Sequence, residues 1–242
     1  MLITERKFGI FNIVNVYFTE VPDTADIPDC DVVTYHIRKN WGDMYGFERK
    51  QYTTTIIDLS QGIDGIWDKI NRQHKRHILR AEKNGIKVKV SNKFEEFKRF
   101  NKKFLKQKNY ADPSGLNILS SKFMQKYGIL FIAENQGEIV GGNLYFHDED
   151  NALLVNTPYQ LFGNSIENKK QIFDTNCYIH WEAMQYFNNL DLINYDFDGE
   201  NYFSRSFGGD HIPRYEYRKF NSLFYQSLFR AWDFFLRMYI KF

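Results

Sequence analysis

The order of apolar and polar residues predicts several short strands at the start of the chain. Three runs typical of strands are separated by turn-rich segments such as VPDTADIPD. They lie at about residues 10–18, 32–36 and 52–59. These runs predict the beginning of a β-sheet.

From Trp67 the spacing of apolar residues changes from that of a strand to that of a helix. Residues that recur at steps of three and four mark one helical face: Trp67, Ile70, His74, Ile78 and Ala81. The pair Asn84-Gly85 predicts the end of this helix, because glycine adopts the left-handed conformation at little cost. The alternating segment IKVKV that follows predicts a strand.

The remainder of the chain alternates between helical and strand patterns. A helix is predicted at 94–107, where phenylalanines occupy one face and lysines the other, and a short helix near 120–126. Next come three antiparallel strands, a long helix and one more strand. Their predicted ranges are 129–134, 139–147, 151–157, 170–188 and 192–197. The core between residues 129 and 198 therefore has the order β-β-β-α-β.

These elements predict a mixed α/β fold (α+β), with a predominantly antiparallel central sheet flanked by helices. The 242 residues suit one domain. Residues 1–60 either complete that domain or are the remnant of the first domain of a tandem pair. An amphipathic helix with a broad apolar face is predicted at 221–242.

Composition narrows the functional classes. The net charge of +2 is too small to predict a nucleic-acid protein, and DNA is not an expected partner. Cys30 and Cys177 match no metal-ligand spacing, so we expect no metal and a reducing compartment, by default the cytoplasm. No run of 18 apolar residues is present, which argues against a membrane span.

Three segments resemble the FemAB-like branch of the GNAT acyltransferases. They are WDKINRQHKRHILRAEKNGIKVKV, ILFIAENQGEIVGGNLYFHDED and YDFDGENYFSRSFGG, which resemble the family's basic helix with its following strand, its Gly-Gly hairpin and its terminal segment. The resemblance implies a GNAT-like fold and transfer of an acyl or aminoacyl group to an amine. The implied donor is acyl-CoA or aminoacyl-tRNA, and the implied acceptor is an amino sugar, a peptide or a cell-envelope precursor.

Candidate catalytic residues follow from that chemistry. Asp196 and Asp198 alternate on the last core strand and point to one face, where a carboxylate can accept a proton from the amine; the alternative is a strand-end turn. Tyr202 falls where many GNAT enzymes have a tyrosine general acid, and its alternative is a buried ring. Glu134 ends a hairpin strand, with a solvated turn carboxylate as its alternative.

Donor binding is predicted around the loop before the long helix. In GNAT-like folds the strand before the long helix and the strand after it splay apart where the donor binds, which the resemblance places at residues 152–156 and 193–198, with Asn156 as a candidate donor contact. The loop that follows approximates the GNAT phosphate loop: Gln160 and Gly163 match it, and Ser165 replaces the usual final Gly or Ala. The alternative is a surface loop that binds nothing. Asn143, after Gly141-Gly142, is a candidate acceptor contact, because glycines let a ligand approach the backbone.

Basic residues offer two candidate substrate sites. Arg76 lies on the helix that follows Trp67 among several lysines and arginines, which suits a phosphate or tRNA, with a solvated helix face as the alternative. Arg205, Arg214 and Arg218 predict a second anion site. A small or lipid-linked amine acceptor is favoured over tRNA. For the C-terminal helix we expect docking on the chain's own sheet or a homodimer before membrane contact, and a non-catalytic binding module is the competing function.

Overall fold

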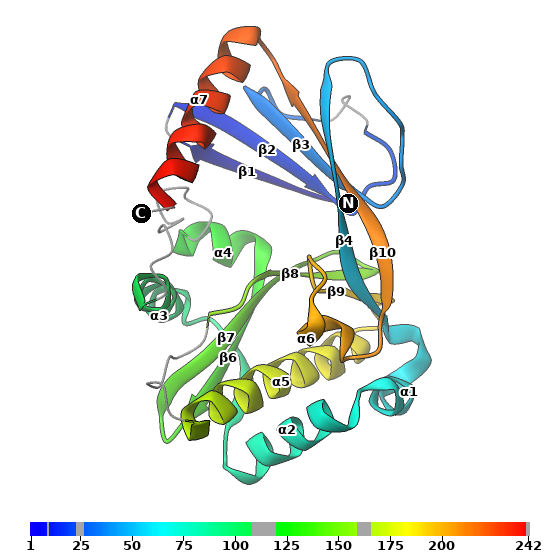
Figure 1. Ribbon diagram of the computed structural model, residues 1–242, viewed down its shortest axis with the longest axis vertical. Helices are drawn as coiled ribbons and strands as arrows, with labels where there is room; N and C mark the ends of the chain where they lie inside the picture. The colour runs from blue at the N-terminus through cyan, green and yellow to red at the C-terminus, as the bar shows by residue number, and fades with distance from the viewer. Residues whose placement is uncertain (9, 23–26, 108–119, 159–165, 241–242) are drawn as a thin grey trace.

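The computed structural model describes residues 1–8, 10–22, 27–107, 120–158 and 166–240. Ten strands form one continuous sheet in the order β1-β2-β3-β10-β4-β9-β8-β7-β6-β5 (Figure 1). The strands are β1 (Leu2–Phe8), β2 (Phe11–Tyr17), β3 (Val32–Ile37), β4 (Phe47–Asp58), β5 (Lys87–Ser91), β6 (Gly128–Asn135), β7 (Glu138–His147), β8 (Asn151–Asn156), β9 (Asn194–Asp196) and β10 (Asp210–Phe220).

The sheet is mixed, as the sequence predicts. Two neighbouring pairs are parallel, β2 with β3 and β8 with β9, and the other seven are antiparallel. The parallel pair of β8 and β9 follows from the long helix between them, because parallel neighbours need a crossover connection. The two long central strands β4 and β10 carry the sheet from its lower to its upper half in Figure 1.

Helices cover both faces of the lower half of the sheet. They are α1 (Gly62–Lys69), α2 (Arg72–Lys83), α3 (Phe94–Gln107), α4 (Ser121–Tyr127) and α5 (Ile166–Asn188), after the 3-10 turn η1 (Leu59–Gln61). Phe131 and Ala133 pack in one core with α1, α2 and α5, whereas Leu130 and Ile132 pack in another with α3 and α4. Alternate residues of β6 thus serve opposite faces, as a strand requires.

The upper half has its own cores. Tyr35, Tyr215 and Tyr217 are buried with valines of β2 and β3 on one face. On the other, Phe11 and Ile13 pack against α7 (Leu223–Ile240), which lies across β1 to β3 in Figure 1. The C-terminal helix therefore docks on the chain's own sheet. No helix within the described ranges is long and apolar enough to cross a membrane.

The structure corrects two sequence predictions. The helix predicted from Trp67 is two helices, because Ile70 and Asn71 are extended and the Asn71 side chain caps α2 by accepting from the His74 amide. The edge strand β1, the eleven-residue strand β10 and the short helix α6 (Tyr202–Arg205) were not predicted. β10 matters most, because it joins β3 to β4 and so connects the two halves of the sheet.

Candidate functional site

The strands β8 and β9 diverge, as the resemblance implies. They pair in parallel at Asn151, Ala152 and Leu153, and the register ends where Leu153 meets Asp196. β8 continues to Asn156 without a partner in β9, and a bulge at Leu144 turns it further. Beyond the last pair, the edge of β8 offers backbone groups that β9 does not satisfy. We call this opening the splay.

Asp196 and Asp198 lie next to the splay and are joined by Arg214. The Arg214 Nη2 is 3.0 Å from Asp196 Oδ2, and its Nη1 donates to Asp198 Oδ1 at 3.0 Å. The Thr54 hydroxyl and the Asp198 amide both donate to Asp196 Oδ1, at 2.6 and 2.8 Å. The Tyr52 hydroxyl donates to Asp198 Oδ1 at 3.3 Å. The two carboxylates therefore share Arg214, and residues of β10 and β4 hold them. Asp198 itself lies beyond β9, in the strand-end turn that the sequence left as the alternative.

The two carboxylates differ in environment. Asp196 is completely buried, whereas the Asp198 side chain keeps 44% of its surface exposed. Desolvation and then the Asp196 charge raise the pKa of Asp198 to about 6, against the opposing effect of Arg214. Asp198 has a φ of 54°, in the left-handed region, so its side chain leaves the line of the strand. This arrangement gives one structural carboxylate and one that meets solvent at a pKa suited to proton transfer.

A second polar cluster lies beneath α5. The hydroxyls of Tyr145 and Tyr195 are 2.6 Å apart, and His180 Nδ1 is 2.5 Å from the Tyr195 hydroxyl. Asn143 donates to the Tyr145 hydroxyl at 2.8 Å. All four side chains are buried, and burial lowers the pKa of His180 to about 3, which keeps its ring neutral. His180 is thus a hydrogen-bonded histidine of the helix α5.

Buried polar atoms near the splay lack hydrogen-bond partners among the described residues. They are Asn143 Oδ1, Asn156 Oδ1, Thr175 Oγ1 and Asn176 Oδ1. A Cβ on Gly141 would come within 3.0 Å of Thr175 Cγ2, so Thr175 packs directly on the glycine two residues before Asn143. Unpaired buried acceptors are costly, and a ligand with N–H donors would satisfy them.

The other predicted catalytic residues, Glu134 and Tyr202, make no hydrogen bond or ion pair with these two among the described contacts. Glu134 is on β6, which β7 and β8 separate from β9, and it pairs with Lys89 at 2.7 Å and Lys93 at 3.3 Å. Tyr202 begins α6 with 71% of its surface exposed, so it is not a buried ring. Of the four predicted catalytic residues, the structure brings only Asp196 and Asp198 together.

The predicted arginine sites do not form one cluster. Arg205 pairs with Glu200 and is 58% exposed, whereas Arg218 pairs with Glu216 at 2.5 Å on the face of β10 that also carries Arg214. Arg76 is exposed on α2. The predicted donor-loop residues Gln160, Gly163 and Ser165 lie outside the described residues.

Sequence reasoning missed Tyr52 as a site residue and the role of Arg214. A signal existed for Arg214, because an arginine within the alternating segment HIPRYEYRKF is typical of a strand face that meets acids. For Tyr52 there was none, because its contact with Asp198 spans 146 residues of sequence.

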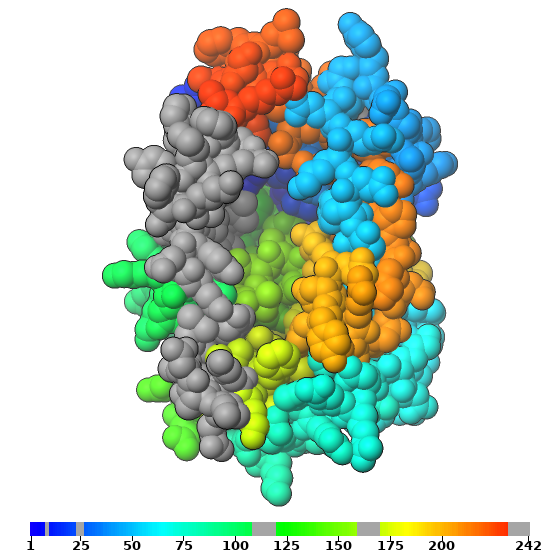
Figure 2. Space-filling view, in the orientation of Figure 1, coloured from blue at the N-terminus to red at the C-terminus, as the bar shows by residue number. Residues whose placement is uncertain are grey.

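The surface is hollowed on the side of the splay. Figure 2 shows a hollow beside β4 and the residues near 200, with green residues of the lower sheet at its floor. At the other ends of β8 and β9, a cavity of about 1090 Å³ is lined by His36, Arg38, Asn151, Asn194 and Arg214, among others. Arg214 thus lines this cavity while its guanidinium holds the pair beside the splay. Among the described residues, no cluster of His, Cys, Asp and Glu is placed to hold a metal ion.

No protein-family model and no curated protein matches this sequence. Solved structures do share its fold. FemX aligns over 95% of this chain and 85% of its own, with a TM-score of 0.61 and 12% identity. A C-terminal domain named for a lysylphosphatidylglycerol synthetase of Agrobacterium fabrum aligns over 95% and 84%, with a TM-score of 0.57 and 13% identity.

The L-PGS of Bacillus licheniformis aligns over 79% of this chain and 69% of its own, with a TM-score of 0.53 and 14% identity. Identities this low establish the fold and no particular substrate. The resemblance predicted from the three sequence segments is confirmed at that level. This chain has the fold shared by FemX and L-PGS.

Proposed function

We propose that this protein is an N-acyltransferase that forms an amide bond at the splay, with Asp198 as general base. The observation that carries the proposal is the Asp198 carboxylate, which is partly exposed beside the splay and is held by Arg214 and Tyr52. A base is most effective when its pKa lies near the working pH, and the pKa of Asp198 is raised to about 6.

The reaction balances as a simple acyl transfer. Asp198 removes one proton from the acceptor ammonium, and the free amine nitrogen attacks the donor carbonyl carbon. The C–N bond forms, and the bond from that carbon to the leaving sulfur or oxygen breaks. The leaving group takes up the second proton, which the attacking nitrogen loses as it becomes an amide nitrogen. Arg214 and Tyr52 are positioning residues in this scheme, because they contact Asp198 and hold its carboxylate toward solvent.

The splay fits a donor that carries N–H groups. Asn143 and Asn156 each present a buried side-chain oxygen without a partner among the described residues. The amides of a coenzyme A arm, or the α-amino group of an aminoacyl donor, would supply the missing donors. When bound, such a donor supplies the activated carbonyl. The names of FemX and lysylphosphatidylglycerol synthetase favour a cell-envelope acceptor for this chain as well.

The variant Asp198→Asn tests the assignment. It keeps the shape of the side chain and removes the base, so amide formation should fall by about 10²- to 10⁴-fold with acetyl-coenzyme A or an aminoacyl-tRNA as donor. In the unaltered protein, kcat/KM should fall below about pH 6 as Asp198 takes up a proton.

Glu134→Gln is the matched control, since it removes a carboxylate that lies across the sheet in ion pairs with lysines. It should keep full activity. Equal rates for Asp198→Asn and the unaltered protein would end the assignment of Asp198. Absence of turnover with both donors and a panel of amines would favour the non-catalytic binding module.

A further inference from the structure

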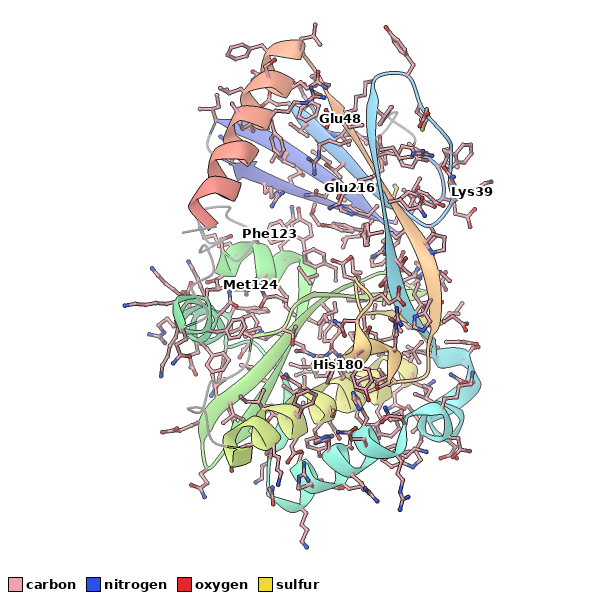
Figure 3. The ribbon with its side chains drawn as sticks, viewed as in Figure 1. Lys39, Glu48, Phe123, Met124, His180 and Glu216 are labelled. Carbon is pink, nitrogen blue, oxygen red and sulfur yellow. The ribbon has the colours of Figure 1, made fainter. Side chains whose placement is uncertain are left out.

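Within the part of the chain that the structure describes, one cation of the upper sheet has no partner that balances its charge. Arg6 lies on β1, where register with β2 and β3 places it on the same face as Tyr17, His36 and Arg218. That face also carries Glu216, which Figure 3 labels between the upper strands and Phe123 of α4. The side chains of Tyr17 and Phe146 meet across this region, with ring centroids 5.5 Å apart.

Arg6 is half-buried, and its Nε is buried without a hydrogen-bond partner among the described residues. No carboxylate of the described chain lies within ion-pair distance of its guanidinium. The acids on its face, Glu216 and Glu48, already pair with Arg218 and Arg230, and Arg218 adds a like charge. Desolvation is the main cause that lowers the pKa of Arg6. A buried charge without a counter-charge is costly, so this position favours an external anion.

Two neutral donors without partners accompany Arg6. Thr4 precedes it by two residues on the same face of β1, is completely buried, and leaves its hydroxyl oxygen without a partner among the described residues. His36 lies on β3, stacked on Tyr17 at 4.5 Å, and its Nε2 is buried and likewise unpartnered. Burial and the surrounding arginines lower the pKa of His36 to about 3, so its ring is neutral.

We propose that Arg6, Thr4 and His36 form a binding site for a phosphate group. One cation and two neutral donors on two strands suit an oxyanion with several acceptor oxygens. The site shares a face of the sheet with Arg214, which contacts Asp198. Glu216 of β10 pairs with His36, and Arg214 lies two residues from Glu216 on the same strand, so both point to the face of His36. A role of this site in holding an acceptor's phosphate during transfer rests on the proposed acyltransferase function. Phosphate binding itself does not depend on that function.

The experiment measures binding without turnover. Full-length protein is titrated with inorganic phosphate and pyrophosphate, and the rise in Tm reports affinity. Arg6→Gln should weaken pyrophosphate binding at least tenfold. Its Tm without ligand should be equal to or above that of the unaltered protein, because the substitution removes an unbalanced buried charge.

Lys7→Gln is the matched control, because it removes the same charge from the next residue, which is exposed and on the opposite face of β1. It should bind pyrophosphate like the unaltered protein. Thr4→Val, which keeps the shape of the side chain, should weaken binding several-fold and serves as the second variant. Equal losses in Arg6→Gln and Lys7→Gln, or no rise in Tm with either anion, would overturn the proposal.

Two sources of phosphate are separated by a second arm. Vesicles of phosphatidylcholine with and without phosphatidylglycerol are sedimented with the protein. Retention that requires phosphatidylglycerol and is lost in Arg6→Gln identifies a lipid headgroup, whereas pyrophosphate binding without retention identifies a soluble phosphate ester. Asp198→Asn should bind pyrophosphate normally, so an inactive enzyme and a missing phosphate site give different results.

Discussion

Replacing Arg214 with methionine removes the charge that joins Asp196 to Asp198 and keeps a side chain of similar length. Arg214 is 1% exposed and Asp196 is completely buried. In Arg214→Met, Asp196 keeps the Thr54 hydroxyl and the Asp198 amide as donors but loses its counter-charge. Removing one partner of a buried ion pair costs about 3–5 kcal/mol. The exposed contact with Asp198 adds little to that figure.

The assay is urea unfolding followed by tryptophan fluorescence and far-UV circular dichroism. The free energy of unfolding should fall by this full cost. It should do so through a lower urea midpoint, with an unchanged dependence of the free energy on urea concentration. The double variant Asp196→Asn, Arg214→Met should recover much of the loss, because no buried charge then remains unpaired. Arg205→Met is the control: its ion pair is exposed, so its cost should stay below about 1 kcal/mol. The reasoning would be refuted if Arg214→Met lost no more stability than the Arg205→Met control. It would also be refuted if the losses of the two single variants simply added in the double variant.

Two further predictions concern stability. Burial lowers the folded-state pKa of His180 to about 3, so the stability it contributes is present above about pH 6.5 and is lost as pH falls toward 3. Calorimetric Tm values between pH 4 and 8 should fall less steeply with acid in His180→Gln; identical slopes would contradict this. Gly208→Ala should cost at least about 1–2 kcal/mol, because φ is 79° and a Cβ would lie 2.5 Å from the Lys69 carbonyl oxygen. Gly199→Ala, where a Cβ meets nothing within 4 Å, should change stability by less than about 0.5 kcal/mol in the same denaturant assay.

The local pattern of apolar, polar and turn residues was sufficient to predict some helices and strands. The helix at 94–107 and the three strands between 128 and 156 were predicted within about two residues, because turn residues bound strands whose alternate side chains serve two cores. The division of the chain into domains, its oligomeric state and its cellular location stay predictions.

The local pattern did not predict elements whose structure depends on contacts with residues far away in the sequence. The helical spacing from Trp67 continues through Ile70 and Asn71, yet the chain turns there, and the Asn71 amide donates to the Ser206 carbonyl oxygen. β10 contains Pro213 and alternates charged with aromatic residues, a pattern that becomes a central strand only between β3 and β4.

The sequence by itself determined the order of the core elements and the fold they resemble, and it placed Asp196 and Asp198 two residues apart at the end of the last core strand. Only the tertiary structure decided that Arg214 joins these carboxylates, that Asp198 is the one of the two that meets solvent, and that Arg6 has no counter-charge among the described residues. The physical reason is that periodicity fixes which face a side chain occupies. The burial of a side chain and its electrostatic partners depend on strands that are far apart in the chain, as the separation of 142 positions between Thr54 and Asp196 illustrates.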